Sequence, residues 1–120
     1  MELIRIGYWA GSASDPWPSV EAFVDVTWDQ EERQRVLMHL RQGVLARAYM
    51  GFSTCRLCGE RNGSIELTDG RFIWPEGLAH YVEVHGVRLP ARFVDSVDEI
   101  QSCLDDAKVD DSWWRVTRSP

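Results

Sequence analysis

The sequence predicts an α+β fold built as one domain over residues 1–120. Two stretches with the helical spacing of apolar residues, 27–43 and 96–107, predict helices, and an alternating stretch around Asp69-Gly70 predicts a β-hairpin between them. No linker long enough to divide the chain separates these elements. A chain of 120 residues buries roughly two thirds of its unfolded surface, so we expect an apolar core of its own.

The chain is predicted to begin with a strand and an irregular loop. Residues 2–9, ELIRIGYW, alternate loosely between apolar and polar positions, as a strand does. The next stretch, AGSASDPWPS, has two prolines and several small residues that favour turns. Trp9 and Trp17 flank this loop, and we expect them to pin it to the core.

The first helix is predicted to begin at Thr27, which has the spacing of a capping box with Gln30 and is followed by acidic residues. Gly43 is the predicted stop. Its apolar stripe comprises Val36, Leu37, Leu40 and Val44. His39 is expected on the surface or as a core histidine with a hydrogen-bond partner. Residues 44–52, VLARAYMGF, predict a strand, with a continuation of the helix as the alternative.

A hairpin and a short helix are predicted next. In SIELTDGRFIW, Ile65 and Leu67 are expected to pair with Phe72 or Trp74 across the Asp69-Gly70 turn. Proline and glutamate at 75 and 76 favour a helix start, and Gly86 favours its end.

The last helix is predicted to begin at Ser96, which pairs with Glu99 in a second capping box. Its inward face comprises Val97, Ile100, Leu104 and Ala107. Cys103 is expected on this helix as a small buried hydrophobic residue. An acidic, solvated segment follows, and at least one of Trp113 and Trp114 is expected to dock on the body or on another chain.

Two cysteines and two histidines bracket the predicted hairpin. Cys55 and Cys58 form a C-x-x-C turn, and His80 and His85 lie on the short helix. Two thiolates and two imidazoles are a typical tetrahedral zinc set, although the spacing of twenty-one residues is longer than in DNA-reading fingers. The sequence therefore predicts one structural Zn²⁺ per chain within a zinc-binding module, residues 51–93. Histidines five apart point about 140° apart on an ideal helix, so the last turn is expected to be loosened.

The same region resembles a group of small bacterial zinc-binding proteins. The motifs that carry the likeness are CRLCG, NGSIELTDG and WPEGLAHYVEVHGVRLP, between about Gly51 and Phe93, with a weaker echo in DPWP and TWDQEERQRVLMHLRQG. For the cysteines and histidines the resemblance implies a bound zinc. It implies no reaction.

A catalytic role for the metal is not expected. A catalytic zinc keeps an open position, whereas this set offers four strong ligands, and neither H-E-x-x-H nor a deaminase motif is present. Glu76 and Glu83 near the ligands are expected to be ordinary charged helix residues. A zinc-dependent hydrolase is therefore the second alternative, and no catalytic residue is assigned.

Nucleic-acid binding is the first alternative, and the charge pattern weighs against it. The net charge is −6, no segment is strongly basic, and residues 72–87 contain no lysine or arginine. Arg56, Arg61 and Arg71 are the residues from which a small cationic face would be built.

The favoured function is binding of a protein partner. A small acidic protein suits a basic partner such as a toxin, and Trp74, Tyr81 and the terminal tryptophans are expected either to fill the core or to anchor the partner. No long apolar run or signal peptide is found, so we expect a cytoplasmic protein without a membrane anchor. The oligomeric state stays open.

Overall fold

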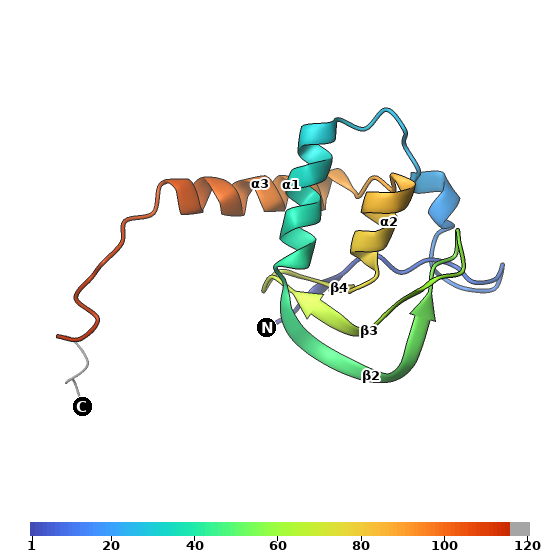
Figure 1. The fold of residues 1–120 in the computed structure, drawn as a ribbon, viewed down its shortest axis with the longest axis horizontal. Helices are drawn as coiled ribbons and strands as arrows, with labels where there is room; N and C mark the ends of the chain where they lie inside the picture. The colour runs from blue at the N-terminus through green and yellow to red at the C-terminus, as the bar shows by residue number, and fades with distance from the viewer. Residues whose placement is uncertain (116–120) are drawn as a thin grey trace.

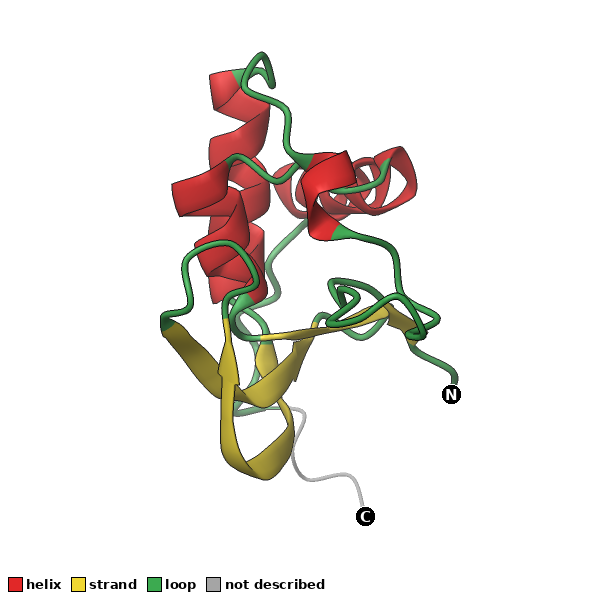
Figure 2. Ribbon diagram, turned by 90° about the vertical axis from the view of Figure 1, so that its right-hand side faces the viewer, coloured by secondary structure: helices red, strands yellow, loops and turns green. Residues whose placement is uncertain are grey.

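The computed structural model describes residues 1–115 and has an α+β architecture. A four-stranded mixed sheet lies on one side and helices pack on the other (Figures 1 and 2). The elements in chain order are β1 (Ile4–Arg5), η1 (Val20–Phe23), α1 (Gln30–Arg41), β2 (Val44–Thr54), β3 (Arg61–Thr68), β4 (Phe72–Pro75), α2 (Leu78–His85) and α3 (Ala91–Asp105). Among the described residues, no helix is long and apolar enough to cross a membrane.

The sheet has the strand order β1-β4-β3-β2, with β1 parallel to β4 and the other neighbours antiparallel. The predicted hairpin is formed by β3 and β4, and Leu67 pairs with Trp74 as expected. Ile65 instead pairs with Ala48 of β2. Asp69 shapes the turn, because its carboxylate accepts the backbone N–H groups of Arg71 and Phe72, both at 2.8 Å.

Strand β2 settles the choice left open for residues 44–52 in favour of a strand. It forms the outer edge of the sheet, is exposed along its whole length, and bends strongly in Figure 1. Its pairing with β3 is interrupted by shifts in register. The helix continuation is wrong, because Gln42 and Gly43 end α1 and Val44, expected on the helix stripe, is an exposed strand residue.

The start predicted for the first helix is wrong by two residues. Asp29 caps α1, accepting the N–H of Glu32 at 2.9 Å, whereas Thr27 bonds to Asp25 in the preceding turn. An aspartate is as good a cap as a threonine, and the segment offered both. The buried face of α1 follows the prediction, with Val36, Leu37 and Leu40 in the core.

Strand β1 is much shorter than the predicted eight residues, and the short helix η1 was not predicted from the loop sequence. Trp9 is buried against Phe23 of η1, with ring centroids 5.2 Å apart, so it does pin the loop. Trp17 is less enclosed, at 42% exposed, and its ring lies 5.5 Å from that of Tyr8.

The N-cap of the last helix lies six residues before Ser96, the predicted cap. Pro90 precedes the first turn of α3, where its missing N–H is not needed. Ser96 is therefore an interior residue, and its hydroxyl accepts from Arg71, which also pairs with Glu99 at 3.1 Å. The capping box was wrong because its two residues bond to the β3–β4 turn instead of to the helix backbone.

Only the first half of α3 packs on the body, and Figure 1 shows the second half projecting away from it. Phe93 and Val97 are buried, but Leu104, Ala107 and Cys103 are exposed. The prediction of a buried Cys103 and of an inward Leu104 and Ala107 is therefore wrong for this chain on its own. Trp113 and Trp114 are 74% and 56% exposed, so neither is buried in the body, and docking on another chain stays a prediction.

The core lies between the sheet and the helices and is rich in aromatic side chains. Trp74 of β4 is fully buried and donates its indole N–H to the carbonyl of Leu40 at 3.3 Å. Phe93 packs edge-on against Phe72 and Trp74, with centroids 5.0 and 5.7 Å away. Tyr81 is also buried, so Trp74 and Tyr81 fill the core, which was one of their two expected roles.

The turn residue Asp69 also holds His39, whose Nε2 lies 2.7 Å from its carboxylate. His39 is thus a partly buried histidine with a partner, one of the two expectations for it. Burial alone would raise the pKa of Asp69, but hydrogen bonds from Phe72, His39 and Arg71 outweigh it and hold that pKa below its usual value.

This depressed pKa predicts a loss of stability in acid. A carboxylate with a lower pKa in the folded state stabilises the fold above its unfolded pKa of about 3.9, and this contribution disappears as the pH falls through the folded value. The free energy of unfolding, measured by urea titration at a series of pH values, should fall below about pH 4. Asp69→Asn should flatten that fall, and Asp106→Asn, an exposed control, should not. An unchanged profile in Asp69→Asn would contradict the assignment.

Candidate metal centre

Cys55 and Cys58 lie in the turn that joins β2 to β3. The turn is closed by two backbone hydrogen bonds of 2.8 Å, from Cys55 N–H to the Glu60 carbonyl and from Gly59 N–H to the Cys55 carbonyl. Gly59 has φ of 76°, a left-handed conformation that glycine adopts without strain. The amide of Leu57 points at the Cys55 sulfur, 3.4 Å away. The turn thus presents both sulfurs on one side.

His80 and His85 come from α2, the first near its start and the second at its last residue. The helix ends at Gly86, whose φ is 65°, and the N–H groups of Gly86 and Val87 both bond to the carbonyl of Tyr81. These bonds reach back five and six residues instead of four, so the last turn is wider than an α-helical turn, as the spacing of the histidines predicted.

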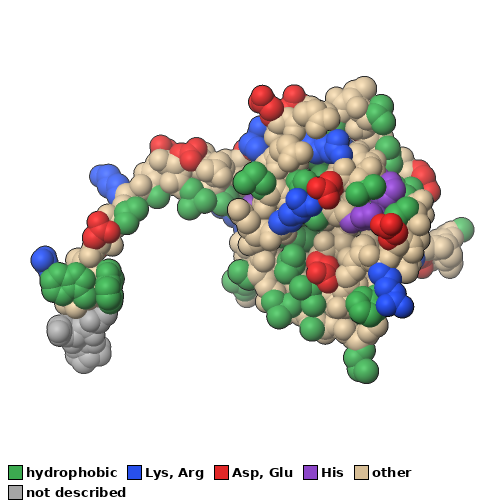
Figure 3. Space-filling view, in the orientation of Figure 1, with side chains coloured by type: hydrophobic (Ala, Val, Ile, Leu, Met, Phe, Trp, Pro, Cys, Tyr) green, Lys and Arg blue, Asp and Glu red, His purple; other side chains and the backbone are tan. Residues whose placement is uncertain are grey.

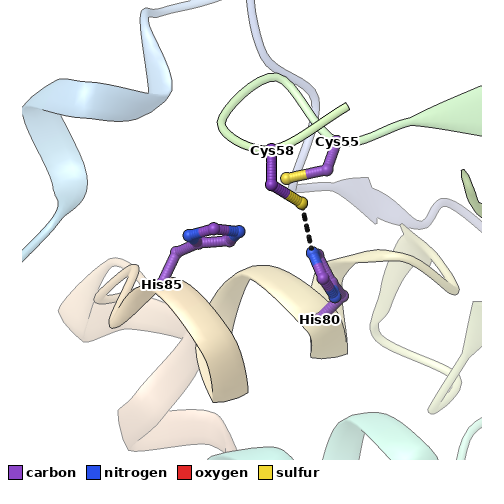
Figure 4. A group of neighbouring side chains, drawn as sticks. All are labelled: Cys55, Cys58, His80 and His85. Atoms are coloured by element: carbon purple, nitrogen blue, oxygen red, sulfur yellow. Dashed lines mark hydrogen bonds between the residues drawn. The ribbon is translucent and has the colours of Figure 1, made fainter. Parts of the chain in front are cut away.

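The structure brings all four predicted ligands together (Figure 4). Their donor atoms lie within 4.8 Å of one another, and the Cys58 sulfur is 3.3 Å from Nε2 of His80. The rings of His80 and His85 have centroids 5.1 Å apart. Cys55 is buried at 3% exposed and Cys58 is exposed, so the cluster lies at the surface with one side enclosed.

The donor set fits a tetrahedral metal ion. Bonds of about 2.3 Å to sulfur and 2.0–2.1 Å to nitrogen place neighbouring donors roughly 3.3–3.8 Å apart. The Cys58–His80 separation of 3.3 Å falls in this range, and the whole set lies within a limit about 1 Å wider. His85 Nε2 is buried and has no hydrogen-bond partner among the described residues. A buried nitrogen without a partner is costly, and a metal ion would satisfy it. The four residues could therefore hold a metal ion.

The ionisation of the two cysteine thiols also favours a bound metal ion. A backbone hydrogen bond at Glu60 lowers the pKa of Cys58, but partial loss of hydration and the interaction with the neighbouring Cys55 thiol together raise it above its usual value. Two thiols this close resist becoming two thiolates, because like charges repel at short range. A divalent cation removes that repulsion and ionises coordinating thiols.

Tyr81 joins the cysteine turn to α2, a role that the sequence did not reveal. Its phenol oxygen accepts the backbone N–H of Arg56 at 2.7 Å, and its ring packs 6.0 Å from that of Trp9. Burial raises the pKa of this phenol, so it stays protonated. No pattern in the sequence marks such a bond, because its acceptor and donor are twenty-five residues apart.

Loss of this bond should weaken metal binding. In Tyr81→Phe the ring stays in the core but the Arg56 amide loses its acceptor, so the cysteine turn is less well positioned. Contacts that orient metal ligands are worth about 10–100-fold in affinity, and we expect a drop of that size in competition with a chromophoric chelator. Tyr49→Phe is the matched control, since the phenol of Tyr49 bonds to Glu66 outside the cluster. Equal affinity in wild type and Tyr81→Phe would refute the role.

The other polar residues near the ligands have structural partners. Glu76 accepts the N–H of Ser64 at 2.7 Å, and Glu83 pairs with Arg41 of α1 at 2.8 Å. Arg61 stacks on Phe52 at the start of β3, while Arg71 lies beyond the opposite end of that strand. Arg61 and Arg71, two of the arginines considered for a cationic face, are therefore not gathered in one place.

Comparison with protein-family models, curated proteins and solved structures found no match for this chain.

Proposed function

We propose that this chain is a non-catalytic, cytoplasmic bacterial protein that binds one structural zinc and acts through a protein partner. The cluster of Cys55, Cys58, His80 and His85 carries the first part. Two thiolates and two imidazoles around one point suit zinc, which accepts both donor types in tetrahedral geometry. Residues 51–93 act as the zinc-binding module within the single domain 1–120.

A structural role for the zinc is supported by the two segments that it would connect. Cys55 and Cys58 belong to the turn between β2 and β3, and His80 and His85 belong to α2, so the ion would fix the hairpin region to the helix. Four protein ligands leave no position for a substrate or an activated water. Glu76 and Glu83, the carboxylates considered as bases, already have partners.

A basic protein is the partner that the charge favours, and neutralising a toxin is one role of that kind. The net charge of −6 would speed association with a basic surface. Helix α2 contains no lysine or arginine, and its two histidines are directed to the cluster, which weighs against reading nucleic acid with this helix.

Cobalt substitution tests the closed site. The visible spectrum of Co²⁺ distinguishes tetrahedral coordination by four protein ligands from an open site with bound water. We expect the tetrahedral spectrum and sulfur-to-metal charge-transfer bands, both lost in Cys58→Ser. A spectrum that changes when small anions are added would reveal an open position at the metal and favour the hydrolase.

A pull-down from the native host tests the proposed partner. Retention of RNA or DNA, with no protein, would contradict a protein partner.

A further inference from the structure

Helix α3 carries an apolar seam that continues beyond the body. The seam residues follow one another at alternating intervals of four and three, the pattern with which helices pair. They are Phe93, Val97, Ile100 and Leu104 in α3, and Ala107 two residues beyond its end. The first two are buried in the core, Ile100 is half-buried, and Leu104 is 63% exposed. The outer half of the seam is thus uncovered within residues 1–115.

A groove opens where the outer half of this seam leaves the body. Its volume is about 620 Å³, and its apolar lining includes Met38 of α1, Val44 of β2, and Ile100 and Leu104 of α3, while polar residues such as Arg35 and Asp98 also line it. We call the four apolar residues and the space between them the α3 groove. Met38 and Val44 are 59% and 64% exposed, so apolar surface faces the seam from the body side. An amphipathic helix fits such a site, with its apolar face in the groove.

The charge around the α3 groove indicates which kind of helix would bind there. Residues 91–115 contain seven acids and three bases, a net charge of −4, which becomes −2 when Arg35 and Arg71 of the body, the partners of Asp98 and Glu99, are included. Figure 3 shows acidic side chains along one edge of the projecting helix and hydrophobic ones along the other. Two copies of this segment side by side would repel each other, whereas a basic helix would be attracted. Asp98 and Glu99 pair with Arg35 and Arg71 of the body, which fixes the inner half of α3 as one wall.

We propose that the α3 groove docks a basic amphipathic helix of the partner protein. This rests on the proposed function, because it presupposes that the chain works through a protein. Leu104 and Ile100 receive the apolar face of the incoming helix, and the acidic edge of the projecting segment attracts its lysines and arginines. Val109 and Trp113, 82% and 74% exposed, extend the contact along the arm beyond α3.

A pair of labelled peptides tests the proposal. One is a fluorescent helical peptide of about five turns with leucines on one face and lysines beside them, and the other has glutamates in place of the lysines. The full chain loaded with zinc should bind the lysine peptide, measured by fluorescence anisotropy, and not the glutamate peptide. Leu104→Asp should weaken binding by about tenfold or more, although its added negative charge alone would strengthen it.

The control variant is Val26→Asp, which adds the same charge at a 92% exposed valine of the loop before α1. Its affinity for the lysine peptide should equal that of the wild type or slightly exceed it. Equal affinity of Leu104→Asp and Val26→Asp for the lysine peptide would show that the peptide is attracted by charge alone. That result would overturn the proposed docking in the α3 groove. A dimer in sedimentation that Leu104→Asp dissociates would overturn it too, because a second copy would then be the occupant.

A pull-down from the native host with wild type and Leu104→Asp separates this proposal from the proposed function. A protein retained by the wild type and lost with Leu104→Asp supports the groove if the peptide result agrees. A protein retained equally by both leaves the function standing and removes the groove. No retained protein and no peptide binding would remove both.

Discussion

Cys58→Ser is expected to release the metal and destabilise the region around the cysteine turn and α2. Zinc binding contributes roughly 10–16 kcal/mol in small zinc modules, so one of four ligands accounts for about 2.5–4 kcal/mol, or roughly a hundredfold to a thousandfold in affinity. Chelator competition should measure that loss, and urea unfolding in the presence of zinc should show a lower midpoint. The destabilisation follows because the turn holding Cys55 and Cys58 loses its link to the histidines of α2.

Cys103→Ser is the matched control. Cys103 is an exposed free cysteine on the outer half of α3, so its replacement changes the thiol count without touching the cluster. Its affinity for zinc and its unfolding midpoint should equal those of the wild type. Equal zinc affinity in Cys58→Ser and Cys103→Ser would contradict the assigned ligand set.

Phe93→Ala should cost about 3–5 kcal/mol of unfolding free energy, as deletions of buried aromatic side chains do. Phe93 is fully buried and contacts the rings of Phe72, Trp74 and His39, so its removal leaves a cavity between α3 and the body. The cavity is hard to close because rings surround it on several sides. Urea or thermal unfolding measures the loss.

Leu104→Ala tests whether the outer half of α3, which projects from the body, is exposed in the free protein. Leu104 is mostly exposed, so truncating it should change the unfolding free energy by less than about 0.5 kcal/mol. A cost for Leu104→Ala comparable to that for Phe93→Ala would mean that the outer half of α3 is covered in the free protein, which would contradict the projecting arm.

Local patterns in the sequence predicted much of the fold. The Asp69-Gly70 turn, the buried face of α1 and the end of α2 at Gly86 follow from spacing and turn chemistry. The start of α3 was missed because Ser96 and Glu99 mimic a capping box while bonding to Arg71, which is distant in sequence. The short β1 and η1 depend on contacts with β4 and Trp9, which no local pattern encodes.

The candidate site also has some residues that the sequence predicted and others that only the structure revealed. Spacing alone identified Cys55, Cys58, His80 and His85 as a possible ligand set, because metal sites constrain residue type and separation. The phenol of Tyr81 was missed, since it acts through a backbone amide on another segment. The exposure of Cys103 was also missed. The apolar seam of α3 predicts burial, and only the structure shows that the seam runs past the body.

The most direct test of the account is elemental analysis of the purified protein, combined with unfolding before and after chelation. The account predicts one zinc per chain, removed by a strong chelator together with a large part of the folding stability, and restored when zinc is added back. Protein that contains no zinc, or that loses its zinc with no change in the unfolding curve, would contradict a structural metal at Cys55, Cys58, His80 and His85.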